Sequence, residues 1–241
     1  ITKDWDMLFV VDGGEGSGKS VICMRMAKYC DSNLKLDNIA FTPEEFKHAI
    51  KNADKYSSVI YDEGFSGLQS KATMSRINRA LVAMLAEIRQ KNLFVFVVVP
   101  TFFDLDKYVA LWRSRALIHV YTGDNFQRGF FAFYSAEKKK MLYIEGKKTY
   151  SYKRPSPDFI GRFVNYYPVN EADYRQKKLK ALNQRADKQV DHDVEEEAQN
   201  LLFKKLLEKE DMTHNERAAF LGMPISTYFY KLRLLKGENG D

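Results

Sequence analysis

The chain has 241 residues and a mass of 28.0 kDa, with 45% hydrophobic and 14% aromatic residues. This length suits one α/β domain with a small appendage or two small domains, and the aromatic content excludes wholesale disorder. The longest apolar run, Leu93 to Val99, is far shorter than the roughly 18 residues of a membrane-spanning helix. A net charge of +6 and a pI near 9.1 permit a polyanionic partner without proving one.

Cysteine usage and the first residues bear on the cellular compartment. Cys23 and Cys30 form neither a disulfide framework nor a metal-ligand spacing. The start of the chain lacks the basic flank, apolar stretch and cleavage site of a signal peptide. We therefore expect a cytoplasmic protein without a membrane partner.

The first predicted strand, 7–11, runs directly into a glycine-rich loop and then into a helix that extends to Tyr29. The loop reads Gly13-x-x-x-x-Gly18-Lys19-Ser20, the complete P-loop pattern in its required context of strand, loop and helix. Its glycines let backbone N–H groups curl around phosphates, and the helix N-terminus adds the positive end of its dipole. We expect Lys19 to reach the terminal phosphates and Ser20 to ligate Mg²⁺. The residues expected to bind the nucleotide are Gly13, Gly14, Glu15, Gly16, Ser17, Gly18, Lys19, Ser20 and Val21.

Strand and helix signals continue to alternate up to residue 121. Apolar runs predict strands at 39–41, 59–61, 93–99 and 116–121. Capping residues and helical spacing predict helices that begin at Pro43 and that cover 75–90 and 104–113. This alternation predicts an α/β fold in which helices flank a parallel sheet of the P-loop NTPase type.

The predicted strand at 59–61 ends on a pair of acids, Asp62 and Glu63. Asp62 can hold Mg²⁺ through water, and Glu63 can polarise the attacking water. Two solvated acids at a strand end are the alternative, which the P-loop makes much weaker. Glu63 favours hydrolysis over a kinase or a guanine-nucleotide switch, and the lack of an Asn-Lys-x-Asp element favours ATP.

With these two motifs, the sequence resembles the additional-strand catalytic-glutamate (ASCE) class of P-loop ATPases. Within that class it is similar to the FtsK/HerA-like and zonula-occludens-toxin-like motors of phages, plasmids and archaeal elements, over residues 7–122. The run from Glu87 to Asn92 and the strand that ends on Pro100-Thr101 also carry the likeness. In that family the strand ends in a Thr-Gln pair, whereas here Phe102 stands in place of Gln. The resemblance implies an ATPase that uses ATP and Mg²⁺.

The resemblance also implies roles for residues outside the two motifs. Thr101 would sense the γ-phosphate, although capping of the next turn by its hydroxyl is an equal alternative. Arg89, Arg113 and Arg115 are rival candidates for an arginine finger. Because none is convincing in cis, the active form is expected to be a homo-oligomeric ring of six subunits, each completing its neighbour's site.

Beyond Gly123 short aromatic runs alternate with lysine-rich segments. The runs at 130–134, 141–144 and 149–152 predict a basic β-meander appended to the core. Dense mixed charge and an apolar stripe predict a helix between 171 and 210. The expected domains are an ATPase core (1–125), the meander (126–168), a charged helical linker (169–211) and a helix-turn-helix (212–241).

The end of the chain resembles a DNA-binding helix-turn-helix. Thr213 and Glu216 form a capping box, Gly222 marks the turn, and a second helix begins at Ile225. The residues expected to contact DNA are Ser226, Thr227, Tyr228, Tyr230, Lys231 and Arg233. A two-helix cap that binds nothing is the alternative, and the basic meander is a rival DNA contact.

Together these features predict a DNA motor of a virus or mobile element, working in the host cytoplasm by ATP hydrolysis in translocation or packaging. Two alternatives remain open at this point. One is a replication or transposition accessory that loads or regulates. The other is a DNA-binding regulator whose nucleotide site only senses ATP.

Overall fold

A computed structural model of the chain describes residues 4–62, 71–207 and 212–235. The chain divides into two compact units, Ile1–Leu182 and Asn183–Asp241. Among the described helices, none combines the length and the apolar character that crossing a bilayer requires.

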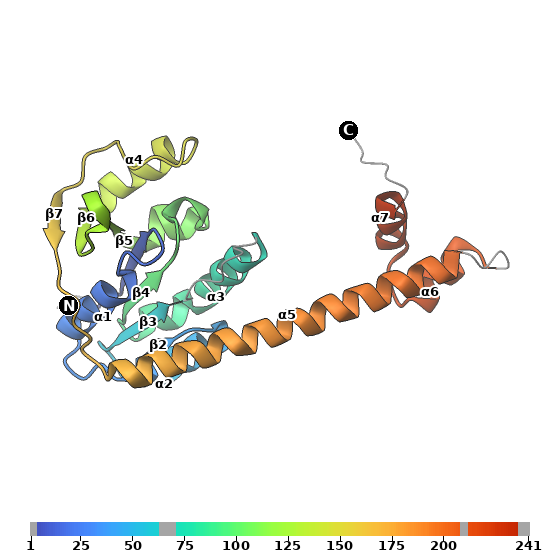
Figure 1. The fold of residues 1–241 in the computed structure, drawn as a ribbon, viewed down its shortest axis with the longest axis horizontal. Coiled ribbons are helices and arrows are strands. Elements are labelled where there is room, and N and C mark those ends of the chain that lie inside the picture. The colour runs from blue at the N-terminus through green and yellow to red at the C-terminus, as the bar shows by residue number, and fades with distance from the viewer. Residues whose placement is uncertain (1–3, 63–70, 208–211, 236–241) are drawn as a thin grey trace. The chain divides into compact units, whose positions relative to one another are not determined.

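The first unit is built on a seven-stranded sheet with the strand order β2-β3-β4-β1-β5-β6-β7 (Figure 1). The strands are β1 (Met7–Gly13), β2 (Ile39–Ala40), β3 (Ser58–Asp62), β4 (Phe94–Val98), β5 (Ser114–Tyr121), β6 (Phe130–Tyr134) and β7 (Phe159–Arg162). Strands β1 to β5 are parallel, and β6 and β7 continue the sheet in antiparallel pairs. Because β1, β3 and β4 are parallel, Gly13, Asp62 and Val98 all lie at the carboxyl edge of the sheet.

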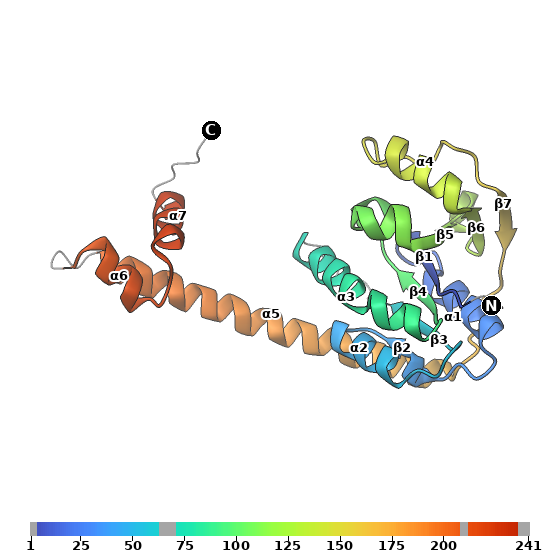
Figure 2. The same ribbon diagram turned by 180° about the vertical axis from the view of Figure 1, so that it is seen from behind.

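Helices cover both faces of this sheet (Figures 1 and 2). One face packs against α1 (Lys19–Cys30) and the first turns of α5 (Glu171–Leu207). The other face packs against α2 (Pro43–Asn52), α3 (Lys71–Gln90), the π-helical turn η3 (Val109–Arg113) and α4 (Ala136–Gly146). The described part of this unit also contains the short 3₁₀ turns η1 (Leu36–Asn38), η2 (Phe102–Asp104) and η4 (Asp124–Phe126). The apolar strands are therefore buried on both sides, as a parallel sheet requires, and the chain has a P-loop NTPase-like α/β fold.

The predicted β-meander is wrong beyond its first strand. Only the run at 130–134 is a strand, β6, whereas 141–144 lies inside α4 and 149–152 adopts no strand. The reason is the spacing of the buried residues of α4, since Lys139, Leu142, Tyr143 and Gly146 follow a helical period and form one face. Residues 126–168 therefore form a strand, a helix and a second strand at 159–162.

The second unit has a small core of its own. It packs the last turns of α5 against α6 (His214–Phe220) and α7 (Ile225–Leu235), around Phe203, Ala218 and Tyr228. The predicted capping box is confirmed, because the Thr213 side chain accepts from the Glu216 N–H and the Glu216 carboxylate accepts from the Thr213 N–H. Gly222 makes the turn between the helices with φ of +62°. The segment predicted as a linker is thus one helix whose first turns belong to one unit and whose last turns belong to the other.

Candidate nucleotide-binding site

The P-loop connects the carboxyl end of β1 to α1, and its backbone depends on glycine. Gly13, Gly16 and Gly18 have φ of +137°, +67° and +101°. A Cβ on Gly13 would lie 1.9 Å from the carbonyl oxygen of Val120, so no larger residue fits beside β5. These constraints hold the loop open at the edge of the sheet.

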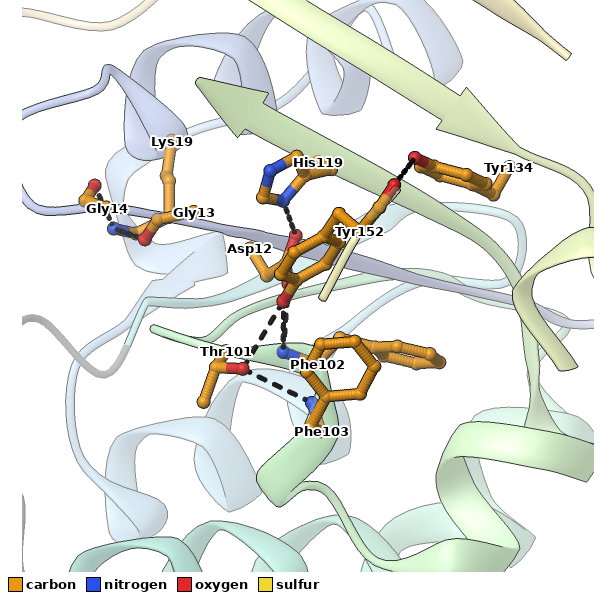
Figure 3. Close-up of polar contacts among 10 residues, drawn as sticks. All are labelled: Asp12, Gly13, Gly14, Lys19, Thr101, Phe102, Phe103, His119, Tyr134 and Tyr152. Atoms are coloured by element: carbon orange, nitrogen blue, oxygen red, sulfur yellow. Dashed lines mark hydrogen bonds and ion pairs between the residues drawn. The ribbon is translucent and has the colours of Figure 1, made fainter. Parts of the chain in front are cut away.

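Lys19 lies across this loop (Figure 3). Its Nζ donates to the carbonyl oxygens of Gly13 and Gly14 at 2.7 and 2.8 Å. Burial lowers the pKa of Lys19, and the nearby carboxylates of Asp12 and Asp62 offset part of that effect. The hydroxyl of Ser17 is buried in the same loop without a hydrogen-bond partner among the described residues.

Asp62 and Ser20, the two predicted metal ligands, lie on either side of one cation. Asp62 ends β3 with only 2% of its surface exposed. The Nζ of Lys178 lies 3.2 Å from Asp62 Oδ2 and 3.4 Å from Ser20 Oγ. The hydroxyl of Tyr174 donates to the same Oδ2 at 2.6 Å, and burial together with Asp62 raises the Tyr174 pKa.

These oxygens fit a hard divalent cation. A hydroxyl and a carboxylate are ligands that Mg²⁺ accepts, and the Lys178 ammonium shows that one positive charge can face both. Within the described part of the chain, no three His, Cys, Asp or Glu side chains gather to form a metal site. Mg²⁺ held here would therefore depend on nucleotide phosphates for its remaining ligands, as is usual for this ion.

A cavity of about 1150 Å³ opens above the P-loop. Residues 13–21, Asp62 and Val98 to Pro100 form its floor, and residues distant in sequence form its walls. The wall residues, which the sequence analysis missed, are Arg128, Gly129, Phe163, Val164, Asn165, Tyr167, Tyr174, Arg175, Lys178, Leu179 and Leu182. Three of them are cationic, which suits a cavity for polyphosphate.

Arg128 is placed over the P-loop by its neighbour Gly129. Gly129 has φ of +96°, and the Phe163 N–H donates to its carbonyl oxygen at 2.8 Å. A Cβ on Gly129 would lie 2.5 Å from the Phe163 carbonyl oxygen, so this close pairing needs glycine. A guanidinium nitrogen of Arg128 would lie 3.5 Å from a Cβ on Gly16. In the sequence, the only local signal for this arrangement is the Arg-Gly pair at 128–129, which matches no known motif.

Thr101 belongs to a polar network beside the cavity (Figure 3). Its hydroxyl accepts from the Phe103 N–H at 3.4 Å and lies 3.3 Å from the Tyr152 hydroxyl. Thr101 therefore caps η2, and of this segment the cavity lining includes Val98 to Pro100 but not Thr101. The geometry favours the capping alternative over the sensor.

The centre of that network is Asp12, which is fully buried at the end of β1. It accepts hydrogen bonds from the Tyr152 hydroxyl and, at 2.9 Å, from the Phe102 N–H. Its other oxygen lies 2.9 Å from His119 Nδ1, and the His119 and Tyr152 rings stack at 3.8 Å. Burial and Asp12 raise the Tyr152 pKa. The network fixes the residue that immediately precedes the P-loop.

The three candidate finger arginines lie at the opposite, amino edge of the sheet. The Arg113 guanidinium pairs with Asp6 at 2.6 Å, and the Arg115 guanidinium lies 4.6 Å from the ring of Trp5. Arg89 is in the last turn of α3, just before β4. Within one chain, Arg89, Arg113 and Arg115 are thus remote from the P-loop edge, and a role in a neighbouring subunit stays a prediction. Glu63 lies outside the described residues.

The prediction that Tyr228 contacts DNA is wrong. Tyr228 is fully buried, and its ring packs against Phe203 and His214 at centroid distances of 5.1 and 5.5 Å. It is an anchor of the small core, because α7 turns the same face that carries Leu232 inward. The remaining predicted residues are accessible: Ser226, Thr227, Tyr230 and Arg233 are exposed and Lys231 is half-buried.

Comparisons with known proteins add one structural likeness. No protein-family model matches the chain, and no curated protein matches it. Among solved structures, it is similar to the crystal structure of the N-terminal domain of zonular occludens toxin from Neisseria meningitidis. That match has a TM-score of 0.39 and 13% identity, and it covers 67% of this chain and 95% of that chain.

Proposed function

We propose that this protein is an ATP-hydrolysing enzyme of the ASCE class of P-loop proteins. The observation that carries the proposal is the pair Ser20 and Asp62, which approach one cation at the rim of a glycine-cradled cavity. The strand order supports the class, because β4 is an additional strand between the P-loop strand β1 and the Asp62 strand β3. Glu63 directly follows Asp62 and is the proposed base for the attacking water.

Each residue of the site has a defined task in this proposal. Lys19 leaves the carbonyl oxygens of its own loop to bind the terminal phosphates, and Arg128 adds a second charge from the opposite wall. Ser20 and Asp62 hold Mg²⁺, which when bound neutralises charge that develops on the phosphates. The Phe163 ring covers part of the loop, since it would lie 3.0 Å from a Cβ on Gly18.

We further propose that hydrolysis drives work on DNA in a ring of subunits, as a FtsK/HerA-like or zonula-occludens-toxin-like motor of a virus or mobile element. The accessible polar residues of α7 and the net charge of +6 support a DNA partner. The placement of Arg113 and Arg115 away from their own P-loop supports a need for a neighbouring subunit.

Hydrolysis measurements separate the motor from its two rivals. Steady turnover that rises with DNA length is expected for the motor. Turnover that depends on a second protein would instead indicate a loader, and nucleotide binding without turnover would indicate an ATP-sensing regulator. Turnover that is absent under every condition would refute the enzyme.

A pair of variants tests the DNA contact through α7. Thr227→Ala combined with Arg233→Gln is expected to weaken binding to duplex DNA and to lessen its salt dependence, because a phosphate contact is lost. Tyr228→Phe is the matched control on the same helix, since its ring faces the core. Equal affinity of the double variant and the parent at matched salt would exclude this surface and favour the basic segment between 138 and 154.

A further inference from the structure

The first turns of α5 are an integral part of the nucleotide site. Tyr174 is buried, and its ring packs against Phe41 and Tyr167 at 5.4 and 5.7 Å. Lys177 Nζ donates to the carbonyl oxygens of Leu36 and Ile39 at 3.2 and 2.6 Å. These contacts dock the start of the helix firmly beside β2 and β3.

From this docked position α5 directs two side chains at one oxygen. The Tyr174 hydroxyl and the Lys178 ammonium both reach Asp62 Oδ2, at 2.6 and 3.2 Å, and they lie 3.3 Å from each other. The same ammonium lies 3.4 Å from Ser20 Oγ. We name Tyr174 and Lys178 the α5 clamp.

We propose that the Lys178 ammonium and Mg²⁺ compete for Ser20 Oγ and Asp62 Oδ2, so that the α5 clamp sets how much magnesium the site requires. The proposal rests on the proposed function, which supplies the nucleotide phosphates that complete the magnesium site. Lys178 is thus a positioning residue. Its charge holds Asp62 and Ser20 together, and it must withdraw when a divalent cation takes those oxygens.

The Lys178 ammonium and Mg²⁺ compete because both would occupy the space between Ser20 Oγ and Asp62 Oδ2. Two positive charges within about 4 Å repel each other strongly at a partly buried site, so the ammonium and the metal exclude one another. Tyr174 shares Oδ2 with Lys178, so withdrawal of the lysine loosens both clamp contacts at once. Without Mg²⁺, the ammonium leaves a positive charge beside the phosphates, which favours binding of free nucleotide.

A magnesium titration tests the competition. Binding of a fluorescent, non-hydrolysable ATP analogue is followed as Mg²⁺ is raised from a chelated solution. Lys178→Met is expected to lower the Mg²⁺ midpoint about tenfold and to weaken binding in chelator. Lys178→Arg, which keeps the charge, is expected to stay near the parent. Lys180→Met removes an equal charge from an exposed position of the same helix and is the control. A midpoint for Lys178→Met that equals or exceeds the parent's overturns the proposal.

A second arm works without any nucleotide. Amide hydrogen exchange over 174–182 is compared between the parent and Asp62→Asn, with Glu44→Gln, an exposed acid of α2, as control. Faster exchange in Asp62→Asn alone is expected, because the variant removes the charge that holds Lys178. Unchanged exchange overturns the clamp. A parent that binds no analogue at any Mg²⁺ concentration refutes the proposed function, whereas this exchange result still decides whether Asp62 holds α5.

Discussion

The two edges of the parallel sheet use their cations in different ways. At the carboxyl edge, Lys19 and Lys178 lie on oxygens of the P-loop, Ser20 and Asp62 that a nucleotide and its metal would also use. At the amino edge, Arg113 is held by Asp6 and Arg115 lies over Trp5. The first set occupies positions that a ligand would need, whereas the second set is engaged, within one chain, with side chains of the fold.

The edge of the sheet at which a cation lies thus indicates its role within its own chain better than its charge does. The family resemblance and positions beside core strands made Arg89, Arg113 and Arg115 candidates for an arginine finger, and all three lie at the amino edge. In open α/β sheets, ligands bind outside the carboxyl ends of the strands. Arg128 and Arg175, at that end, are the described arginines that line the cavity of their own chain.

The largest expected effect concerns the backbone of the carboxyl edge. Gly13→Ala forces a Cβ against the Val120 carbonyl oxygen at a φ of +137°, and it should destabilise folding by about 4 kcal/mol or more. Gly14→Ala is the control, because no atom lies within 4 Å of its Cβ position. Urea unfolding measures both. Equal stability of the two variants would show that β1 and β5 are not packed as described.

The next effect tests whether the carboxyl-edge groups perform chemistry. Lys19→Ala should abolish nucleotide binding or turnover, and Glu63→Gln should preserve binding while lowering turnover at least about 10²-fold. Lys28→Ala, at the other end of α1, should leave both unchanged. Parental turnover by Glu63→Gln would refute the assignment of the base.

Substitutions at the amino edge are expected to have a smaller effect, which concerns the free energy of unfolding. Arg113→Ala leaves the carboxylate of Asp6 buried without its partner, at 4% exposure of that side chain, and should lower the free energy of unfolding by about 2 kcal/mol. Arg115→Ala should cost less than about 1 kcal/mol, since it removes a cation–π contact with an exposed ring. Thermal unfolding checks both values.

Subunit mixing tests whether an amino-edge arginine acts in a neighbouring subunit. Inactive Arg89→Ala subunits mixed with inactive Glu63→Gln subunits should regain activity if that arginine completes a neighbouring site. Arg115→Ala and Arg113→Lys, which keeps a charge for Asp6, enter the same test. Absence of recovery for all three would confine the amino-edge arginines to structural roles.

The effect at Lys139, a buried cation near the amino edge, depends on pH. Its Nζ donates to the carbonyl oxygens of Ala110 and Leu111 at 2.6 and 3.2 Å, and burial lowers its pKa to about 8 from 10.5. Between pH 8 and 10.5 the unfolded chain binds this proton and the folded chain does not, so stability rises with pH.

Lys139→Met removes that dependence. Relative to the variant, the parent should gain about 1–2 kcal/mol in free energy of unfolding between pH 7.5 and 9.5. Urea titrations at the two pH values measure the difference, and Lys148→Met, at an exposed position shortly after the helix, is the control. A parent that shows no relative gain would mean that Lys139 titrates normally.

Much of the carboxyl edge could be predicted from the sequence, because its signals are local. The P-loop and the Asp62 strand each lie within one short segment, where apolar runs and glycine spacing have few structural solutions. Arg128, Tyr174 and Lys178 reach the same edge only through tertiary packing. No short-range pattern distinguishes them from solvated surface cations and aromatics.

The errors have equally physical causes. The run at 141–144 is too short for its period to separate strand from helix, and its burial beside Lys139 is decided by the packing of η3. Tyr228 was predicted to contact DNA because it carries a hydroxyl and has polar neighbours in the sequence. Its i, i+4 relation to Leu232 is the signal that places it in the core.

The hydrogen bond from Tyr152 to Asp12 joins residues 140 positions apart. On a ribosome that adds about 5–20 residues per second, the partner of Asp12 is made on the order of ten seconds after Asp12 itself. During that interval the nascent chain contains every residue of the P-loop but lacks the hydroxyl that fixes its first strand end. The order of synthesis therefore places the P-loop on the nascent chain well before the hydroxyl that supports the strand end beside it.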